Sequence, residues 1–151
     1  MEHQLDSDTV ATLRFVSEQG EPFTIDLVKE LSLSDATFEE DVEKQPGKYA
    51  WWASVLERTR QKARAKEDEL EYTHATLSNE ARKVLDKPTV ASIESYVKVN
   101  DNYVETLHEL RFWQGRVDML VYIVKSFEQR ERMLMQKGAQ LRKSLDNERT
   151  R

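Results

Sequence analysis

The spacing of apolar positions divides the chain into a short alternating start and two long helical stretches. Over residues 49–84, apolar or small side chains recur every three or four positions, which is the spacing of one face of an α-helix. The same spacing recurs over 103–141. A break at 86–88 separates them, and 89–99 is predicted to form a short third element. We expect a mainly all-α fold whose long helices form an antiparallel hairpin.

Turn and cap signals refine this prediction. TLRFV, at residues 12–16, is followed by an alternating segment with Phe23, Ile25 and Leu27, so the N-terminal part predicts a small β-hairpin. Asp35 is expected to cap a short acidic helix that ends before Pro46 and Gly47, and Asp101 or Asn102 is expected to cap the second long helix.

The composition favours helices that need partners. The chain is 38% hydrophobic and 34% charged, with few Gly and Pro, so long solvated helices are expected rather than a large single core. The second long helix is apolar nearly all round between Val117 and Val124. We therefore expect a homo-oligomer whose interface includes Val117, Leu120, Val121, Val124, Phe127 and Leu134.

The absence of cysteine excludes disulfides, zinc-thiolate sites and thiol catalysis. Residues 1–9 are acidic and polar, unlike a signal peptide, and the longest apolar run is too short to cross a bilayer. We expect a soluble cytoplasmic protein that does not enter membranes.

Charge divides the chain at Gln45. Residues 1–45 hold 12 acidic and 3 basic residues, a net charge of −9, and 46–151 hold 16 acidic and 20 basic residues, a net charge of +4. The first part is interpreted as an acidic N-terminal element that contacts a basic partner surface or screens the basic DNA-binding band when DNA is absent. The second is interpreted as a helical hairpin that carries DNA binding and oligomerisation.

The densest basic stretch is RTRQKARAK, residues 58–66. On a helix, Arg58, Lys62 and Lys66 form one stripe, and Arg60 and Arg64 lie on the other flank. If Leu77 lies opposite Leu110, a second basic segment reaches the same level, and together the two could follow a phosphate backbone. The expected DNA-binding residues are Arg58, Arg60, Lys62, Arg64, Lys66, Lys125, Arg130 and Arg132.

Two other interpretations of these residues stay open. The cations could form a solvated face or pair with the acids that follow them directly, Glu67, Asp68, Glu69 and Glu71. Single-strand preference needs an aromatic platform, for which Trp51 is the best candidate, although it could instead cover a neighbouring element. The remaining aromatic residues considered are interpreted as packing residues: Trp52, Phe112, Trp113, Tyr122 and Phe127.

A metal-dependent enzyme is a weaker alternative. Glu71 with His74 and Glu105 with His108 have the Glu-x-x-His spacing of di-iron helical bundles, but such sites need two further helices. No GxxxxGK[ST], GxSxG or HExxH motif is present. We expect no catalytic residues, no metal and no cofactor.

The segment LHELRFWQGRVDMLVYIVKSFEQRERMLMQKGAQLR, together with Tyr49 and Trp52, resembles the UvsY family of bacteriophage recombination mediators. The resemblance covers roughly residues 49–143. Its most specific parts are Tyr-x-x-Trp at the start of the first long helix, Leu-x-aromatic-Trp ending at Trp113, and a hydrophobic-then-basic helix that ends near Gly138. Lys62-Ala-Arg64 repeats a Lys-Ala-Arg motif implicated in DNA binding in that family.

The resemblance implies a non-enzymatic protein that binds single-stranded DNA and forms a ring-like homo-oligomer. It also implies that the protein helps to load a RecA-like recombinase onto strands coated by single-strand-binding protein, within the host cytoplasm. The alternative is a coiled-coil structural or scaffolding phage protein whose cations only solubilise the helices.

Overall fold

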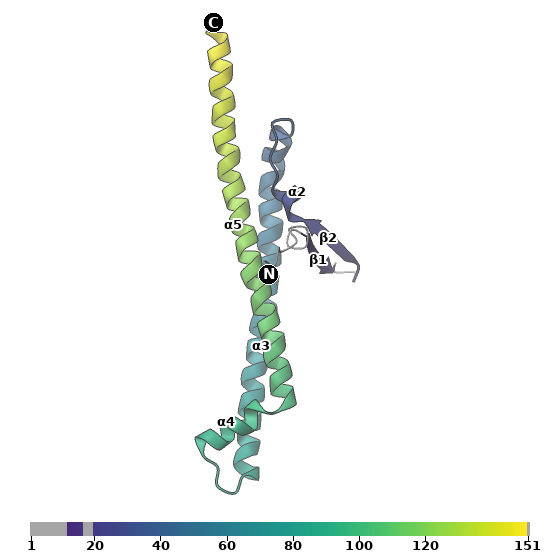
Figure 1. Cartoon of the computed structure of the whole chain (residues 1–151), viewed down its shortest axis with the longest axis vertical. Helices are drawn as coiled ribbons and strands as arrows, with labels where there is room; N and C mark the ends of the chain where they lie inside the picture. Colours follow the sequence, from purple (N-terminus) through teal and green to yellow (C-terminus); the bar gives the residue numbers. More distant parts are fainter. Residues whose placement is uncertain (1–11, 17–19, 151) are drawn as a thin grey trace, which may run out of the picture. The chain divides into compact units, whose positions relative to one another are not determined.

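The computed structural model describes residues 12–16 and 20–150, and its fold is mainly α-helical, as predicted. Along the chain, the elements shown in Figure 1 are β1 (Thr12–Val16), β2 (Pro22–Asp26), α2 (Leu27–Leu31), α3 (Phe38–Val84), α4 (Val90–Lys98) and α5 (Asp101–Arg149). Their contacts define two compact units. The central unit is Tyr49–Lys125, and the terminal unit joins the described residues up to Lys48 with those from Ser126 onward. This geometric division differs from the charge-based one, which stays a prediction.

The predicted N-terminal β-hairpin is present. β1 and β2 pair antiparallel, with Phe15 opposite Phe23, and these two rings stack with their centroids 5.4 Å apart. β2 ends at Asp26 because the Asp26 carboxylate accepts hydrogen bonds from the backbone N–H groups of Val28 and Lys29, at 3.0 and 3.2 Å. This N-cap starts the short helix α2, which the alternating pattern did not predict.

The prediction that an acidic helix ends before Pro46 is wrong, because α3 continues through this proline. Contacts on both sides of Pro46 hold the backbone in place, and they offset the hydrogen bond that a proline removes. Gln45 Nε2 donates to the Phe127 carbonyl oxygen at 2.7 Å, and Lys48 Nζ lies 3.2 Å from a Glu30 carboxylate oxygen. Asp35 does not cap this helix either, because α3 begins at Phe38 and the Thr37 carbonyl accepts from the Asp41 N–H at 2.8 Å. Asp35 instead forms an ion pair with Lys137.

The terminal unit is tightly packed where α3 begins. Phe127 and Leu134 of α5 are buried, with Phe127 fully inaccessible. At Gly138 the phenyl ring of Phe38 lies so close that a Cβ on this glycine would stand 3.2 Å from the ring Cζ. The absence of a side chain at Gly138 therefore allows the close approach of α3 and α5 within this unit.

In the central unit, α3 and α5 run antiparallel, as predicted, but the expected register is wrong. Lys66 pairs with Glu109, and Lys62 Nζ lies 4.7 Å from the centroid of the Trp113 ring. Leu110 therefore lies near the level of Lys66. In the expected register, Leu110 would lie opposite Leu77. In the observed register it lies about 12 residues further toward the N-terminus of α3, a displacement of about 18 Å at 1.5 Å per residue.

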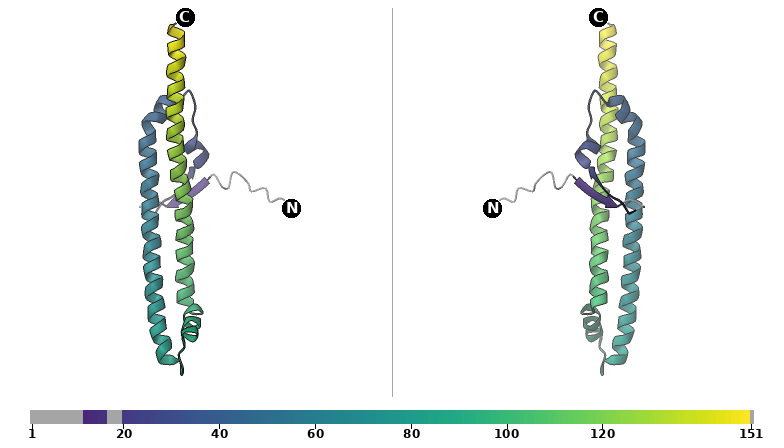
Figure 2. Two further views of the ribbon diagram at one scale, coloured as in Figure 1. Left: turned by 90° about the vertical axis from the view of Figure 1, so that its left-hand side faces the viewer. Right: turned by 90° about the vertical axis from the view of Figure 1, so that its right-hand side faces the viewer.

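The short helix α4 accounts for this displacement. Thr89 caps α4 as part of a capping box, and α4 lies beside the last turns of α3 (Figure 2). The Tyr96 hydroxyl donates to Glu80 at 2.9 Å, and His74 Nε2 lies 2.9 Å from a Glu94 oxygen. Because α4 occupies this part of α3, α5 begins further back along it. Asn100, rather than Asp101 or Asn102, caps α5, because its side chain accepts from the Asn102 N–H at 3.0 Å.

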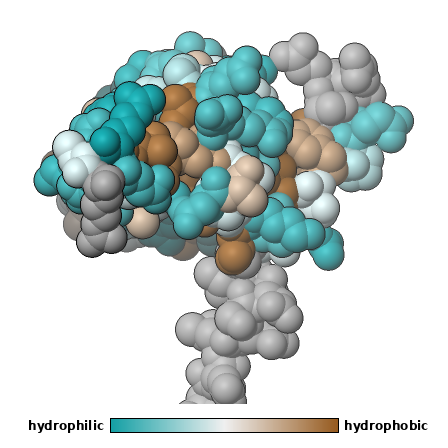
Figure 3. All heavy atoms as spheres, turned by 90° about the horizontal axis from the view of Figure 1, so that it is seen from above, coloured by the Kyte–Doolittle hydropathy of each residue, from teal (hydrophilic) through white to brown (hydrophobic). Residues whose placement is uncertain are grey.

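Four of the six residues expected to contact other copies are already buried in the single chain: Leu120, Val124, Phe127 and Leu134. They bury their apolar surface without a second copy, so they do not offer an exposed interface, and only Val117 and Val121 are half-buried. Seen from above, hydrophobic residues still lie among hydrophilic ones on the surface (Figure 3). Exposed apolar side chains include Leu141 and Leu145 near the end of α5. Oligomerisation itself stays a prediction.

Among the described residues, neither long helix contains a stretch apolar enough to cross a membrane.

Candidate nucleic-acid interface

The five cations of residues 58–66 lie on two flanks of α3, in agreement with the helical-wheel prediction. Arg60 and Arg64 each lie 3.8 Å from a Glu57 carboxylate oxygen. Lys62 and Lys66 instead contact residues of α5. The two flanks therefore have different surroundings, and the Lys-Ala-Arg triplet is divided between them.

Lys66 is the most strongly paired cation of the stretch. Its ammonium group bonds to Glu109 and also to Glu69, the latter at 2.7 Å. The hydrogen bond with Glu109, followed by that with Glu69, holds the pKa of Lys66 well above its usual value. Lys66 therefore stays charged at any physiological pH, but two carboxylates balance its charge, so it contributes less than Lys62 to a positive surface.

A cation–aromatic row links the two helices of the central unit; it consists of Lys62, Trp113, Phe112 and Arg116. Lys62 Nζ lies over the Trp113 ring, and the Trp113 and Phe112 rings meet nearly edge to face with centroids 5.3 Å apart. Arg116 Cζ lies 5.0 Å from the Phe112 centroid. The row thus places a cation at each end of an aromatic pair.

Arg58 extends this surface along α3. It precedes Lys62 by one helical turn, about 6 Å, so the two side chains project from the same flank. Arg58 is an exposed residue, and its Nη2 lies 3.4 Å from the Ser54 hydroxyl. Arg58, Lys62 and Arg116 therefore form a local group of cations drawn from both helices.

Of the three α5 residues expected to join this group, only Lys125 belongs to the central unit, and it does not lie at the level of the group. Trp113 is opposite Lys62, whereas Lys125 lies about 18 Å further along α5. Lys125 is exposed, with its Nζ 5.9 Å from the Tyr122 ring centroid, and Arg132 is exposed in the terminal unit. The predicted coincidence of two basic segments is wrong because it depended on the incorrect register.

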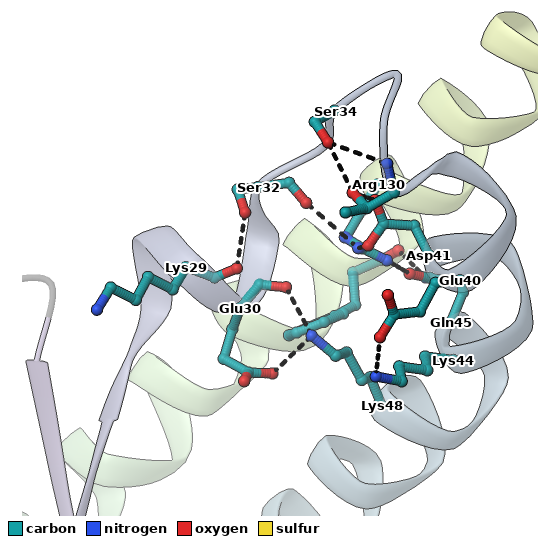
Figure 4. Close-up of polar contacts among 12 residues, drawn as sticks. Lys29, Glu30, Ser32, Ser34, Glu40, Asp41, Lys44, Gln45, Lys48 and Arg130 are labelled. Carbon is teal, nitrogen blue, oxygen red and sulfur yellow. Dashed lines mark hydrogen bonds and ion pairs between the residues drawn. The ribbon is translucent and has the colours of Figure 1, made fainter.

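Arg130 is not available to a phosphate. Its side chain is only 2% exposed and points between α3 and the segment after α2 (Figure 4). Its guanidinium donates to Gln45 Oε1 at 2.5 Å, to Asp41 Oδ1 at 2.7 Å and to the Ser32 carbonyl at 3.3 Å. Arg130 is therefore not accessible to DNA, since its side chain is buried and internal acceptors engage both Nη atoms.

Burial also affects the carboxylate that faces Arg130. Burial opposes ionisation of Asp41, but a hydrogen bond from the Thr37 hydroxyl and the charge of Arg130 outweigh it, so the pKa of Asp41 lies below its ordinary value. Asp41 is therefore ionised at neutral pH and balances the buried guanidinium.

The Glu-x-x-His pairs do not converge. His74 contacts Glu94 of α4 and lies 3.4 Å from the Ser78 hydroxyl, whereas His108 is exposed. Over residues 12–16 and 20–150 there is no group of three or more His, Cys, Asp or Glu side chains that could hold a metal ion.

Two aromatic residues interpreted as packing residues are in fact exposed. Phe112 is 53% and Tyr122 is 71% exposed. Their positions, off the apolar stripe of the second long helix, were the signal that could have identified them. Trp51, the expected platform, is partly exposed and meets Trp52 edge to face at 4.8 Å. Its predicted role in binding single strands stays a prediction.

No protein-family model, curated protein or solved structure matches this chain.

Proposed function

We propose that this protein binds single-stranded DNA through the central unit and acts as a recombination mediator. The observation that supports DNA binding best is that Lys62 and Arg116, from different helices, lie at the two ends of one aromatic pair, with Arg58 a turn away. Clustered cations attract a phosphate backbone by releasing its counterions, whatever the base sequence. The local positive charge can therefore outweigh the net charge of −5 of the whole chain.

The mediator role rests on the resemblance of residues 49–143 to the UvsY family. In this proposal the protein is not an enzyme. It acts in the host cytoplasm as a homo-oligomer, in which several copies of the cation group provide avidity for one strand. Its protein partners are a RecA-like recombinase and single-strand-binding protein.

The DNA-binding part is tested by titrating a fluorescent single-stranded oligonucleotide at two salt concentrations. Replacing Lys62 and Arg116 by Gln should weaken binding and reduce the slope of log affinity against log salt by about 1.4, since each lost phosphate contact contributes about 0.7. The matched control is the Arg60→Gln, Arg64→Gln double variant. It removes the same charge from the flank that pairs with Glu57, so its effect should be smaller. Equal effects of the two double variants would contradict the proposed location.

The mediator part needs a separate assay. The DNA-dependent ATPase activity of a RecA-like recombinase from the same source is measured on strands coated by single-strand-binding protein. Adding this protein should shorten the lag before ATPase activity appears, and the Lys62, Arg116 variant should restore the lag. If the protein binds DNA but does not change the lag, the proposed mediator role is wrong and only the proposed DNA binding stands.

A structural or scaffolding role is the second candidate, favoured by one observation. Arg60, Arg64 and Lys66 pair with carboxylates of the same chain, as expected of cations that only stabilise and solubilise helices. Negligible binding of oligonucleotide at low salt would support this role.

A further inference from the structure

Phe112 is an exposed aromatic ring in a charged neighbourhood. Single exposed apolar residues are common on proteins, so exposure alone indicates nothing. What distinguishes Phe112 is its two neighbours, because the Trp113 ring meets it nearly edge to face and the Arg116 guanidinium lies 5.0 Å from its centroid. These contacts restrict the ring, yet 53% of the residue stays accessible. The protein thus presents an oriented aromatic surface to solvent.

An unpaired nucleobase is the ligand that this surface fits. Bases of single strands stack on aromatic rings and on guanidinium planes, whereas the bases of a duplex are already stacked on each other. Stacking tolerates any sequence, because every base has a π-face. A ring held in place before binding also loses little side-chain freedom when a base arrives.

The cations of the row match the rest of a nucleotide. A base on Phe112 has a phosphate on each side of it along the strand, and Arg116 and Lys62 lie on the two sides of the aromatic pair. A purely electrostatic surface would not distinguish a strand with bases from a strand without them. A surface that combines ring and cations would.

We propose that Phe112, held between Trp113 and Arg116, is a stacking platform for one unpaired base, with Lys62 and Arg116 contacting the adjacent phosphates. This inference rests on the proposed single-strand binding and makes that binding selective for strands with accessible bases. It replaces Trp51 as the principal platform.

The test compares three labelled ligands by fluorescence anisotropy: a single-stranded oligonucleotide, an abasic strand of the same length, and a duplex. The unmodified protein should bind the base-containing strand about fivefold or more tightly than the abasic strand. The duplex should also bind more weakly than the base-containing strand. Phe112→Ala should reduce binding of the base-containing strand to that of the abasic strand, and leave abasic binding and its salt slope unchanged. Phe112→Tyr should retain the preference.

The control variant is Tyr72→Ala, which removes another exposed ring of the central unit, 75% accessible and outside the row. It should leave all three affinities unchanged. Because both rings are exposed, neither substitution should lower the melting temperature, which circular dichroism checks.

The outcomes separate the two proposals. If the unmodified protein binds base-containing and abasic strands equally, DNA binding stands and the stacking platform is wrong. The platform is also wrong if Phe112→Ala weakens both strands alike or changes neither. Binding to none of the ligands at low salt overturns the proposed function, and the platform with it.

Discussion

The Arg130 guanidinium donates a 2.7 Å hydrogen bond to Asp41, although these residues are 89 positions apart in the sequence. One partner is on α5 and the other is in the first turn of α3. The pair fixes the start of α3 against α5 within the terminal unit, and the link from Arg130 to the Ser32 carbonyl ties in the segment that follows α2.

Removing Asp41 should destabilise the protein more than replacing both partners. Asp41→Ala leaves the Arg130 charge buried without its carboxylate, at a cost of about 3–5 kcal/mol in the free energy of unfolding. Asp41→Ala combined with Arg130→Met removes the buried charge as well and should recover much of that loss. Urea denaturation followed by circular dichroism measures both. A double variant as unstable as the single one would show that the cost does not come from the unpaired charge.

The same pair predicts acid sensitivity. The folded-state pKa of Asp41 is below its ordinary value of 3.8, so its ionised form stabilises the fold above pH 3.8. That contribution is lost as pH falls from 3.8 through the lower folded pKa. Asp41→Asn should therefore be less stable than the unmodified protein near neutral pH, and the difference should shrink below pH 3.8. Melting temperatures across this range measure it, and a difference independent of pH would contradict the prediction.

Two glycines of α5 offer a matched test of the packing at Phe38. Nothing lies within 4 Å of a Cβ built on Gly115, so Gly115→Ala should stabilise the protein by about 0.5–1 kcal/mol through helix propensity. At Gly138 the added methyl group would meet the Phe38 ring at 3.2 Å. Gly138→Ala should therefore gain less, or lose stability. If urea denaturation shows that both substitutions raise the free energy of unfolding equally, the Phe38 ring can move aside without destabilising the protein.

In the proposed DNA-binding surface, Glu109 should weaken the binding of single strands through its ion pair with Lys66. Glu109→Gln removes a negative charge beside the cation–aromatic row and leaves Lys66 with Glu69 alone, so affinity for single strands should rise and its salt dependence should steepen. Asp118→Asn removes the same charge from an exposed position of α5 outside the row and is the control. If both variants raise the affinity equally, the effect is one of net charge rather than of this site.

Local patterns predicted the elements well because each depends on neighbouring residues. The alternation around Phe23 indicated the β-hairpin, and apolar spacing indicated both long helices. Pro46 was misinterpreted as a helix end because a local rule does not include contacts with distant residues, such as the hydrogen bond from the Gln45 side chain to the Phe127 carbonyl. The basic stretch of the candidate site was visible in the sequence, and the position of Phe112 off the apolar stripe indicated that it is exposed. The contact between Lys62 and Trp113 was not visible, since it depends on how α5 lies against α3.

Hydrophobic spacing acts over one or two turns, so the amino-acid pattern alone was enough to indicate the β-hairpin and the two long helical stretches. Which distant residues meet depends on tertiary packing. α4 packs along the end of α3 and displaces α5, which places Trp113 rather than Lys125 beside Lys62. Arg130, one cation among many in the sequence, is buried because Asp41 and Gln45 together offset the loss of its hydration. The register of two helices and the burial of a charged side chain depend on contacts between distant segments, which no local pattern contains.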